Sequence, residues 1–439
     1  MTDFDRIRVL WPDHLGLARG KYLPTHLVNK GTGHAAAVFS LQYDRSFAPA
    51  PGSFVEDGVP DLHATIDPDS LRQGWDDQHT GVAVADLTMN HEPYVYSSRH
   101  ALRSAIEAWT ALGYSPKVGI ELEGYVMEPD GDGGWKPWDT PGSFVYGTGP
   151  MVDPVGLLDD IMRTAAASGI SVESINAEFD NAQFEMTLEY DDALKAADDA
   201  FLFRVLARER AMAHGLRMTF MGQPINELSG SGVHVNFSFL DADGNNPLAD
   251  ESADDGLSAL ARQCLAGLCK HHQAMAALLA PTVNAYRRLA LGGFAGVRAS
   301  WGYDHRVVGN RVPPPRGAGT RLENRTADGA ASIHAAVAAV LQAARLGVEH
   351  QLECPEPETG DGFENPVTDV LCAPSLPEAL QMLEADQRFV DAVGPELVAN
   401  FVFVKNIEWE RFTTANPTWA DDDPSAVTQW ELDEYMPFH

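Results

Sequence analysis

The sequence predicts an α+β protein in which a small N-terminal domain, residues 1–97, precedes a large domain, residues 98–439. The chain length of 439 residues suits two or three domains at about 150 residues each. A composition of 44% apolar and 21% charged residues excludes disordered and fibrous classes. Helical and strand-like patterns alternate from residue 99 to about residue 350, whereas the preceding part contains short apolar runs broken by Pro and Gly.

The individual elements follow from local signals. Ser97 or Ser98 caps a helix that ends at Gly113, and Asp153 followed by Pro154 opens a second helix. The strand-like runs are 7–11, 81–88, 94–98, 117–128, 170–179, 183–190, 217–224 and 232–239. The helical segments are 99–113, 153–169, 191–215, 254–280, 330–352 and 376–412.

Two features are expected to have structural roles only. The segment from Asp130 to Gly134 has the aspartates of a calcium loop but lacks the later ligands, so a hairpin turn is expected. The cysteines are scattered and form no CxxC pair, which indicates free thiols in a reducing compartment rather than a zinc site or disulfides. They are Cys264, Cys269, Cys354 and Cys372.

The net charge of −32 excludes two classes of partner. A chain with 63 acidic and 31 basic residues repels nucleic acid and anionic membranes. The basic residues include only seven lysines, and we interpret this acidic, arginine-rich composition as adaptation to high salt, where screening removes self-repulsion. An acidic protein from a low-salt organism is the alternative. No apolar run reaches transmembrane length and no secretory leader is evident, so we expect a cytoplasmic protein.

Several acidic residues stand inside strand-like apolar runs. Glu121 and Glu123 are two residues apart, and alternate residues of a strand share a face. His234 and Asn236 share a face for the same reason. Taken singly, Glu121 and Glu123 would usually face solvent. A histidine such as His234 is usually hydrogen-bonded in the core or at the surface, and a glutamate such as Glu323 usually forms a surface salt bridge. As a set they suit Mg²⁺ or Mn²⁺, which prefer carboxylate oxygen and accept imidazole. The candidate metal ligands are Glu121, Glu123, Glu178, Glu185, His234 and Glu323.

Arginines accompany these carboxylates along the chain. Guanidinium groups bind carboxylates and phosphates, so metal ions together with arginines indicate phosphoryl transfer on an anionic substrate. The sequence contains neither a GxxxxGK[ST] segment nor a GxGxxG segment after a strand, which excludes a P-loop and a Rossmann turn. The candidate arginines are Arg288, Arg306, Arg311 and Arg325.

Six ordered segments make the chain resemble the glutamine synthetase family. These segments are GIELEGYVM, EFDNAQFE, GSGVHVNFSF, PTVNAYRRL, WGYDHRVVGNRVP and RLENR. Ala182 stands in the second segment where the family usually has glycine. The early segments LGLARGKYLP and DPDSLRQGWDDQHTGVAVADL resemble the branch that ligates amines, which includes γ-glutamylpolyamine synthetases. The resemblance implies an N-terminal β-grasp domain and a catalytic α/β domain with a curved antiparallel sheet.

The resemblance also implies a role for each matched residue. Glu123, Glu178 and Glu185 match the ligands of the metal at the substrate carboxylate. Glu121, His234 and Glu323 match the ligands of the metal at the nucleotide phosphates. The remaining matches are Arg288 for the α-carboxylate, Gly230 for the α-amino group, Arg306 and Arg311 for the phosphates, Asn236 for the nucleotide side, and Arg325 for the reacting γ-carboxylate.

Four positions depart from the ammonia-using pattern. Ser229 stands where asparagine often contacts the amino acid, Asn236 replaces a second histidine, and residues 332–334 replace the usual N-P-Y. Phe294 occupies the place of a flap glutamate, and no aspartate-bearing D-G-S-S-type loop is found. A phenylalanine there would pack against an alkyl or aryl amine, although it can also pack beneath the loop. The departures at Ser229 and Asn236 leave the acid substrate open.

We therefore predict an ATP-dependent carboxylate–amine ligase. ATP, as co-substrate, phosphorylates the γ-carboxylate of glutamate, and an amine displaces phosphate to form a γ-glutamyl amide. The alternatives are a true glutamine synthetase, which uses ammonia, and a non-catalytic structural or regulatory relative. Two or more Mg²⁺ or Mn²⁺ ions per site are expected. The resemblance further implies a homo-dodecamer or another ring homo-oligomer, with each site shared between neighbouring subunits.

Overall fold

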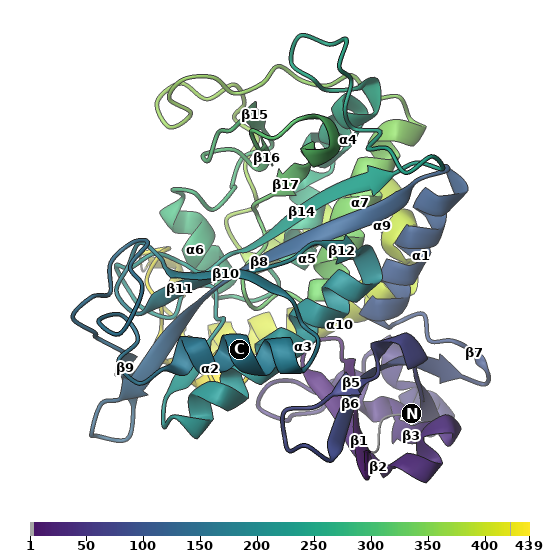
Figure 1. Ribbon diagram of the computed structural model, residues 1–439, viewed down its shortest axis with the longest axis vertical. Helices are drawn as coiled ribbons and strands as arrows, with labels where there is room; N and C mark the ends of the chain where they lie inside the picture. Colours follow the sequence, from purple (N-terminus) through teal and green to yellow (C-terminus); the bar gives the residue numbers. More distant parts are fainter. Residues whose placement is uncertain (1–3, 422) are drawn as a thin grey trace.

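The computed structural model describes residues 4–421 and 423–439, and its strands form two separate sheets (Figure 1). The N-terminal sheet has the strand order β2-β1-β6-β4-β3, with β5 and β7 also pairing with β6. Its strands are β1 (Arg6–Pro12), β2 (Ala18–Pro24), β3 (Thr32–Ala35), β4 (Asp61–Ile66), β5 (Arg72–Gln73), β6 (Thr80–Met89) and β7 (Glu92–Pro93).

This first sheet has a core of its own. Strand β1 is parallel to β6 and antiparallel to β2, and buried residues such as Val9, Trp11 and Leu62 pack together with Phe39. The strand predicted at 94–98 is wrong, because β7 already ends at Pro93 and the next residues form the turn that leads into a helix. Residues 6–93 thus form one mixed sheet with short 3₁₀ helices.

The second sheet is formed by strands from residues 115–324, and its long strands β8 and β14 lie side by side at its centre (Figure 1). Its order is β10-β11-β8-β14-β17-β16-β15, and every pairing is antiparallel except β15 with β16. Its strands are β8 (Ser115–Pro129), β9 (Trp135–Pro137), β10 (Val172–Ala177), β11 (Gln183–Leu188), β12 (Asp191–Asp192), β13 (Arg217–Thr219), β14 (Val233–Leu240), β15 (Trp301–Tyr303), β16 (Asn310–Val312) and β17 (Leu322–Asn324).

The helices confirm the predicted positions but not all of the predicted lengths, and two short helices, at 285–291 and 429–435, were not predicted. They are α1 (Ser98–Ala111), α2 (Leu157–Ala167), α3 (Ala193–Ala213), α4 (Ala259–Lys270), α5 (His272–Leu279), α6 (Ala285–Leu291), α7 (Ile333–Glu349), α8 (Leu376–Ala385), α9 (Gln387–Val393), α10 (Pro395–Ala415) and α11 (Gln429–Tyr435). Ser97 caps α1 and Gly113 follows it with a positive φ, as predicted.

Three helix predictions need correction. Helix α2 starts at Leu157 rather than at Pro154, because its N-cap is Gly156, whose φ is +70°; the Asp153 carboxylate accepts the backbone N–H groups of Leu157 and Leu158 from the turn before the helix. The predicted helix 254–280 is two helices that begin after Ser258 and meet at His271, whose Nδ1 lies 2.6 Å from Asp386. The predicted helix 376–412 is three helices, which break at Asp386 and at Gly394.

The two structural expectations are confirmed. Strand β9 pairs with β8 across the Asp130 turn, in which the Asp130 carboxylate accepts the N–H groups of Asp132 and Gly134, so the segment is a hairpin. All four cysteines are free thiols. In the described ranges, no helix is both long enough and apolar enough to cross a membrane.

Alternation along the central strands separates a core face from an open face. Val118, Ile120 and Leu122 of β8 are at most 1% exposed and lie on the side of β8 that packs with helices α1 and α3. Because neighbouring residues of a strand point to opposite faces, Glu121 and Glu123 lie on the other side, where their side chains are partly accessible. The functional candidates therefore occupy the face that the helices leave free.

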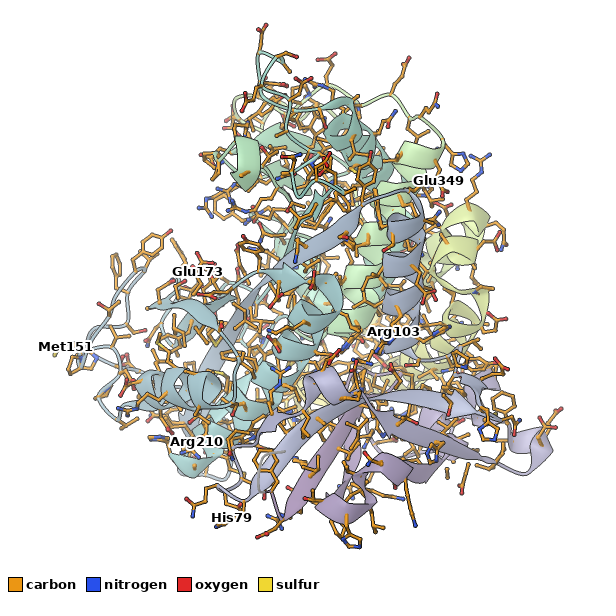
Figure 2. The ribbon with its side chains drawn as sticks, turned by 45° about the vertical axis from the view of Figure 1, so that its right-hand side comes forward. His79, Arg103, Met151, Glu173, Arg210 and Glu349 are labelled. Atoms are coloured by element: carbon orange, nitrogen blue, oxygen red, sulfur yellow. The ribbon has the colours of Figure 1, made fainter. Side chains whose placement is uncertain are left out.

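An ionic network joins the N-terminal sheet to the large sheet's helices. Arg99 of α1 is 1% exposed and contacts three carboxylates: Asp67, Asp86 and Asp198, with distances of 2.8 Å to Asp67 and 2.7 Å to Asp198. Arg103, labelled at this junction in Figure 2, binds Asp67 and Asp86 as well. The carboxylates come from both parts of the chain, so the network orients one part against the other.

Candidate functional site

Strand register brings predicted ligands from four strands, β8, β11, β14 and β17, onto one face. Glu185 of β11 is directly opposite Glu123 of β8, and Glu121 of β8 is directly opposite His234 of β14. Opposite residues of paired strands project from the same face of a sheet. On the next strand, Glu323 of β17 pairs with Asn236 of β14 on one side and with Arg311 of β16 on the other. Residues up to 202 positions apart, from Glu121 to Glu323, thus become neighbours.

His234 lies at the centre of this face. Its Nδ1 is 3.0 Å from Glu121 Oε2 and 3.6 Å from Glu323 Oε1, and its Nε2 is 3.7 Å from Glu123 Oε1. Two groups have ligand atoms within 4.8 Å of one another: Glu121, His234 and Glu323, and Glu123, Glu185 and His234. Carboxylate oxygens with one imidazole and no thiolate are the donor set of Mg²⁺ or Mn²⁺. The residues present therefore fit two adjacent divalent ions.

The carboxylates on this face repel one another, and this repulsion shifts their pKa values. Burial, together with the charges of Glu121, Glu123 and Glu178, raises the pKa of Glu185 to about 7. Burial and the charge of Glu123 also raise the pKa of Glu178. Burial works in the same direction at Glu121, but the His234 hydrogen bond and charge outweigh it and lower that pKa to about 2. Like-charged carboxylates gathered in a partly buried place are stabilised by bound cations.

Glu178 stands at the edge of the cluster rather than in either group. It follows strand β10, and its carboxylate accepts the N–H of Phe179 at 2.7 Å. The exposed Arg306 contributes to its electrostatic surroundings, so these two predicted site residues are near each other. Ala182, between Glu178 and Glu185, has a φ of +67°, a left-handed conformation that glycine adopts more easily. This explains why a glycine would suit that position.

Two arginines bind Glu323. Arg311 donates from Nη1 to Glu323 Oε2 at 2.8 Å and from Nη2 to Asp304 at 2.6 Å. The Arg325 guanidinium pairs with the other Glu323 oxygen. Glu323 is only 1% exposed, so its buried carboxylate is neutralised by Arg311 and Arg325, two of the arginines predicted for the site.

Arg288 lies beneath the glycines that precede β14. Its guanidinium donates to the backbone oxygens of Thr326, at 2.9 Å, and Arg325, at 3.3 Å. A Cβ at Gly232 would lie 2.7 Å from Arg288 Nη2, and one at Gly230 would lie 2.5 Å from its Cγ. Among the residues described, Arg288 has no carboxylate within 4.0 Å, although it is 96% buried. It is therefore a buried cation with capacity for an anionic ligand.

The loop after α6 carries Phe294. Gly292 and Gly293 have positive φ values, and Phe294 is 58% exposed, so it does not pack beneath the loop. Its ring contacts that of Phe363, with centroids 6.2 Å apart and planes at 65°. The loop then returns to the site, because a Cβ at Gly296 would lie 2.9 Å from the backbone of Arg325.

The sequence reasoning missed three residues in this area. Arg321 donates to Asn236 Oδ1 at 3.1 Å, and the same Asn236 donates to Glu121 at 2.9 Å. Gln183 donates to the Gly230 carbonyl at 3.0 Å. Gln183 is two residues from Glu185 in a predicted strand and Arg321 is two residues from Glu323, so the spacing offered a signal for both. Phe363 lies in an irregular loop and carried no such signal.

Known proteins are similar to this chain over most of its length. The family profile described as glutamine synthetase, catalytic domain, matches residues 95–434. The gamma-glutamylethanolamide synthetase GlnA4 of Streptomyces coelicolor is 31% identical over 98% of this chain and 92% of its own length. The glutamine synthetase of Thermotoga maritima is 32% identical over 80% of this chain and 78% of its own. The glutamine synthetase of Halobacterium salinarum is 28% identical over 98% of this chain and 93% of its own length.

Solved structures share the whole fold. GmaS in complex with ADP superimposes with a TM-score of 0.84 and 28% identity, over 98% of this chain and 96% of that one. A structure described as a novel glutamine synthase homolog gives a TM-score of 0.84 at 24% identity, which supports the fold alone. The similarity thus covers both sheets.

Proposed function

The chain belongs to the glutamine synthetase family of ATP-dependent carbon–nitrogen ligases, and we propose that it joins glutamate to an organic amine. ATP phosphorylates the γ-carboxylate, and the amine then displaces phosphate to give a γ-glutamyl amide. The observation that carries this proposal is a face with two groups of carboxylate and imidazole ligands in a chain that has Phe294, an exposed aromatic side chain, at the predicted acceptor position. The similarity to a gamma-glutamylethanolamide synthetase supports it.

Six residues are proposed to hold two or more Mg²⁺ or Mn²⁺ ions. Glu123, Glu178 and Glu185 serve the ion next to the substrate carboxylate, and Glu121, His234 and Glu323 serve the ion next to the nucleotide phosphates. When bound, the ions supply positive charge for the oxygens of the transferring phosphoryl group. The raised pKa of Glu185 supports this assignment, because its cause is the crowding of negative groups that cations relieve.

The chain's own cations orient the two anionic substrates. Arg288, a buried guanidinium with no carboxylate partner in the described residues, binds the glutamate α-carboxylate, and the Gly230 backbone contacts the α-amino group. Arg306 and Arg311 face the phosphates. Arg325 holds the γ-carboxylate in line with the phosphoryl group, which requires it to exchange its contact with Glu323 for one with the substrate. Asn236 orients Glu121 and Arg321 on the nucleotide side.

Phe294 is proposed to select the acceptor. A carboxylate at this place would attract ammonium, whereas a phenyl ring offers dispersion and hydrophobic contact to an alkyl or aryl group. Gly292 and Gly293 allow the flap to move over the site. The second candidate is a true glutamine synthetase, which the 32% identity to the Thermotoga maritima enzyme favours. A non-catalytic relative is disfavoured, because all six ligand positions carry donor side chains.

The larger organisation is proposed from the same family. Residues 1–97 form a β-grasp domain and residues 98–439 the catalytic domain. Subunits assemble into a homo-dodecamer or another ring in the cytoplasm, where the N-terminal domain supplies one wall of a neighbour's site.

The deciding experiment is ATP-dependent phosphate release with glutamate and a panel of acceptors. We expect at least one organic amine to exceed ammonia in kcat/KM, and mass spectrometry to identify the γ-glutamyl amide. Ammonia that matches or exceeds every amine would make glutamine synthetase the better assignment. Absence of turnover with all acceptors, while Mg²⁺ and ATP still bind, would favour a different acid substrate.

A further inference from the structure

A cavity lies between the N-terminal sheet, helix α3 and residues 437–439. Its volume is about 410 Å³, which falls in the range of small-molecule sites. None of the predicted metal ligands lines it. Four arginines line it, Arg8, Arg19, Arg204 and Arg208, together with the Glu209 side chain and His439, the last residue of the sequence. This excess of positive charge is unexpected in a chain of net charge −32.

Two of the four arginines already have acidic partners. Arg8 binds Glu209 at 2.6 Å, and Arg19 binds Asp13 at 2.6 Å. The other two do not: in residues 4–421 and 423–439, no carboxylate oxygen lies within 4.0 Å of the guanidinium of Arg204 or Arg208. The cavity therefore contains two cations without a direct ion-pair partner on one face of α3, four residues apart; Asp328 and Glu209 act on them only from farther away.

The hydrogen bonds of these two arginines go to backbone carbonyls. Arg204, which is 7% exposed, donates to Gly329 O at 2.7 Å and Ala331 O at 2.9 Å. Arg208 donates to Pro437 O at 2.6 Å and to Phe438 O at 2.5 Å. Backbone carbonyls position a guanidinium but do not neutralise it.

Keeping two such cations together costs free energy. Burial, and for Arg204 also the charge of Arg208, lowers the pKa of each side chain to about 10. A buried charge without a counter-ion destabilises the folded state, and a bound anion removes that penalty. The planar guanidinium group matches carboxylate and phosphate oxygens in particular.

We propose that this cavity is an effector site for a small dianion that carries carboxylate or phosphate groups. Arg204 and Arg208 bind the anion from α3, and Arg8 and Arg19 add positive charge from the N-terminal sheet. The cavity is separate from the catalytic face, so binding here does not require the substrates.

Arg204 connects the cavity with the catalytic face. Its two carbonyl partners belong to the segment directly after Arg325, and the intervening Asp328 is fully buried. An anion that draws the Arg204 guanidinium into the cavity changes the hydrogen bonds that hold this segment. Binding of an anion in the cavity is therefore linked to the position of Arg325. Because linkage between two sites is reciprocal, substrate binding at Arg325 also changes the affinity of the cavity for the anion.

The first test measures binding without substrates. Equilibrium dialysis of the full chain with radiolabelled inorganic phosphate or succinate, at constant ionic strength, should show saturable binding of at least one probe. R208Q should weaken that binding at least tenfold, and R208K should give an intermediate value. R163Q, on the exposed outer face of α2, is the matched control and should bind like the wild type. Preference for phosphate or for succinate identifies the natural ligand class.

The second test measures ADP formation at subsaturating glutamate, because phosphate is both probe and product. The probe should change the wild-type rate at least twofold and leave the R208Q rate unchanged, while both proteins have similar rates without it. An effect that persists in R208Q would place the anion at the catalytic site and overturn the proposal. Absent saturable binding, equal binding by R208Q, or an unchanged wild-type rate would each overturn it too. The binding test does not depend on which amine is the acceptor.

Discussion

Replacing Glu185 by glutamine should stabilise the metal-free protein while it abolishes activity. Burial and three neighbouring carboxylates raise the pKa of this group from 4.5 to about 7. At pH 8 the folded protein must ionise Glu185 against that shift, at about 1.4 kcal/mol per pKa unit, so the penalty is about 3 kcal/mol. Glutamine has the same shape but no charge, and it removes the penalty.

The effect has a defined pH window. Below the unfolded pKa of 4.5 the carboxyl group is protonated in both states and the penalty vanishes. It grows as the pH rises towards 7 and is complete above the folded pKa. The stability advantage of Glu185→Gln should therefore be largest at pH 8 and should fade towards pH 5.

The assay is thermal unfolding in chelator, with and without added Mg²⁺ or Mn²⁺. For a chain of this length, about 3 kcal/mol corresponds to a rise of about 3 °C in melting temperature. Metal should raise the melting temperature of the wild type and have much less effect on the variant, because a ligand is missing. Glu173→Gln is the control, since Glu173 is an exposed glutamate on the neighbouring strand β10 (Figure 2). A variant that melts below the wild type in chelator, or that keeps the full metal-induced shift, would refute the reasoning.

Three further perturbations test other parts of the account. Phe294→Glu should lower the ratio of kcat/KM for a propyl- or butyl-sized amine over ammonia by about 30- to 150-fold, the value of two to three kcal/mol of lost apolar contact; an unchanged ratio would remove Phe294 from the acceptor pocket. Raising KCl from about 0.1 M to about 2 M should raise the melting temperature substantially, because the Debye length falls well below about 10 Å; a flat or falling melting temperature would contradict adaptation to salt. Arg99→Met should destabilise the protein by about 3–5 kcal/mol, because it leaves Asp198 buried without its main partner. Arg163→Met is the control for Arg99→Met. If Arg99→Met lowered the melting temperature by less than about 1 °C, the ionic network around Arg99 would contribute little to stability.

Much of the site was predictable because its signals are local. Alternation with a period of two placed Glu121 with Glu123 and His234 with Asn236, and β8 and β14 confirm both placements. Helix caps were predictable for the same reason, as Ser97 shows. The errors arose where distant groups decide the outcome. His271 interrupts a helix that looks continuous in sequence, and its partner Asp386 is 115 residues away.

The sequence by itself determined the charge of the protein, the faces of its strands and the chemical types of the candidate ligands, because these depend on composition and on the geometry of neighbouring residues. Only the tertiary structure decided that Glu185 lies opposite Glu123 and that Glu323 lies two strands from Glu121. It alone placed Phe363 against Phe294 and left Arg204 and Arg208 without acidic partners among the described residues. The physical reason is that strand register, loop contacts and ion pairing are set by hydrogen bonding and packing between segments far apart in the chain, and no local pattern encodes them.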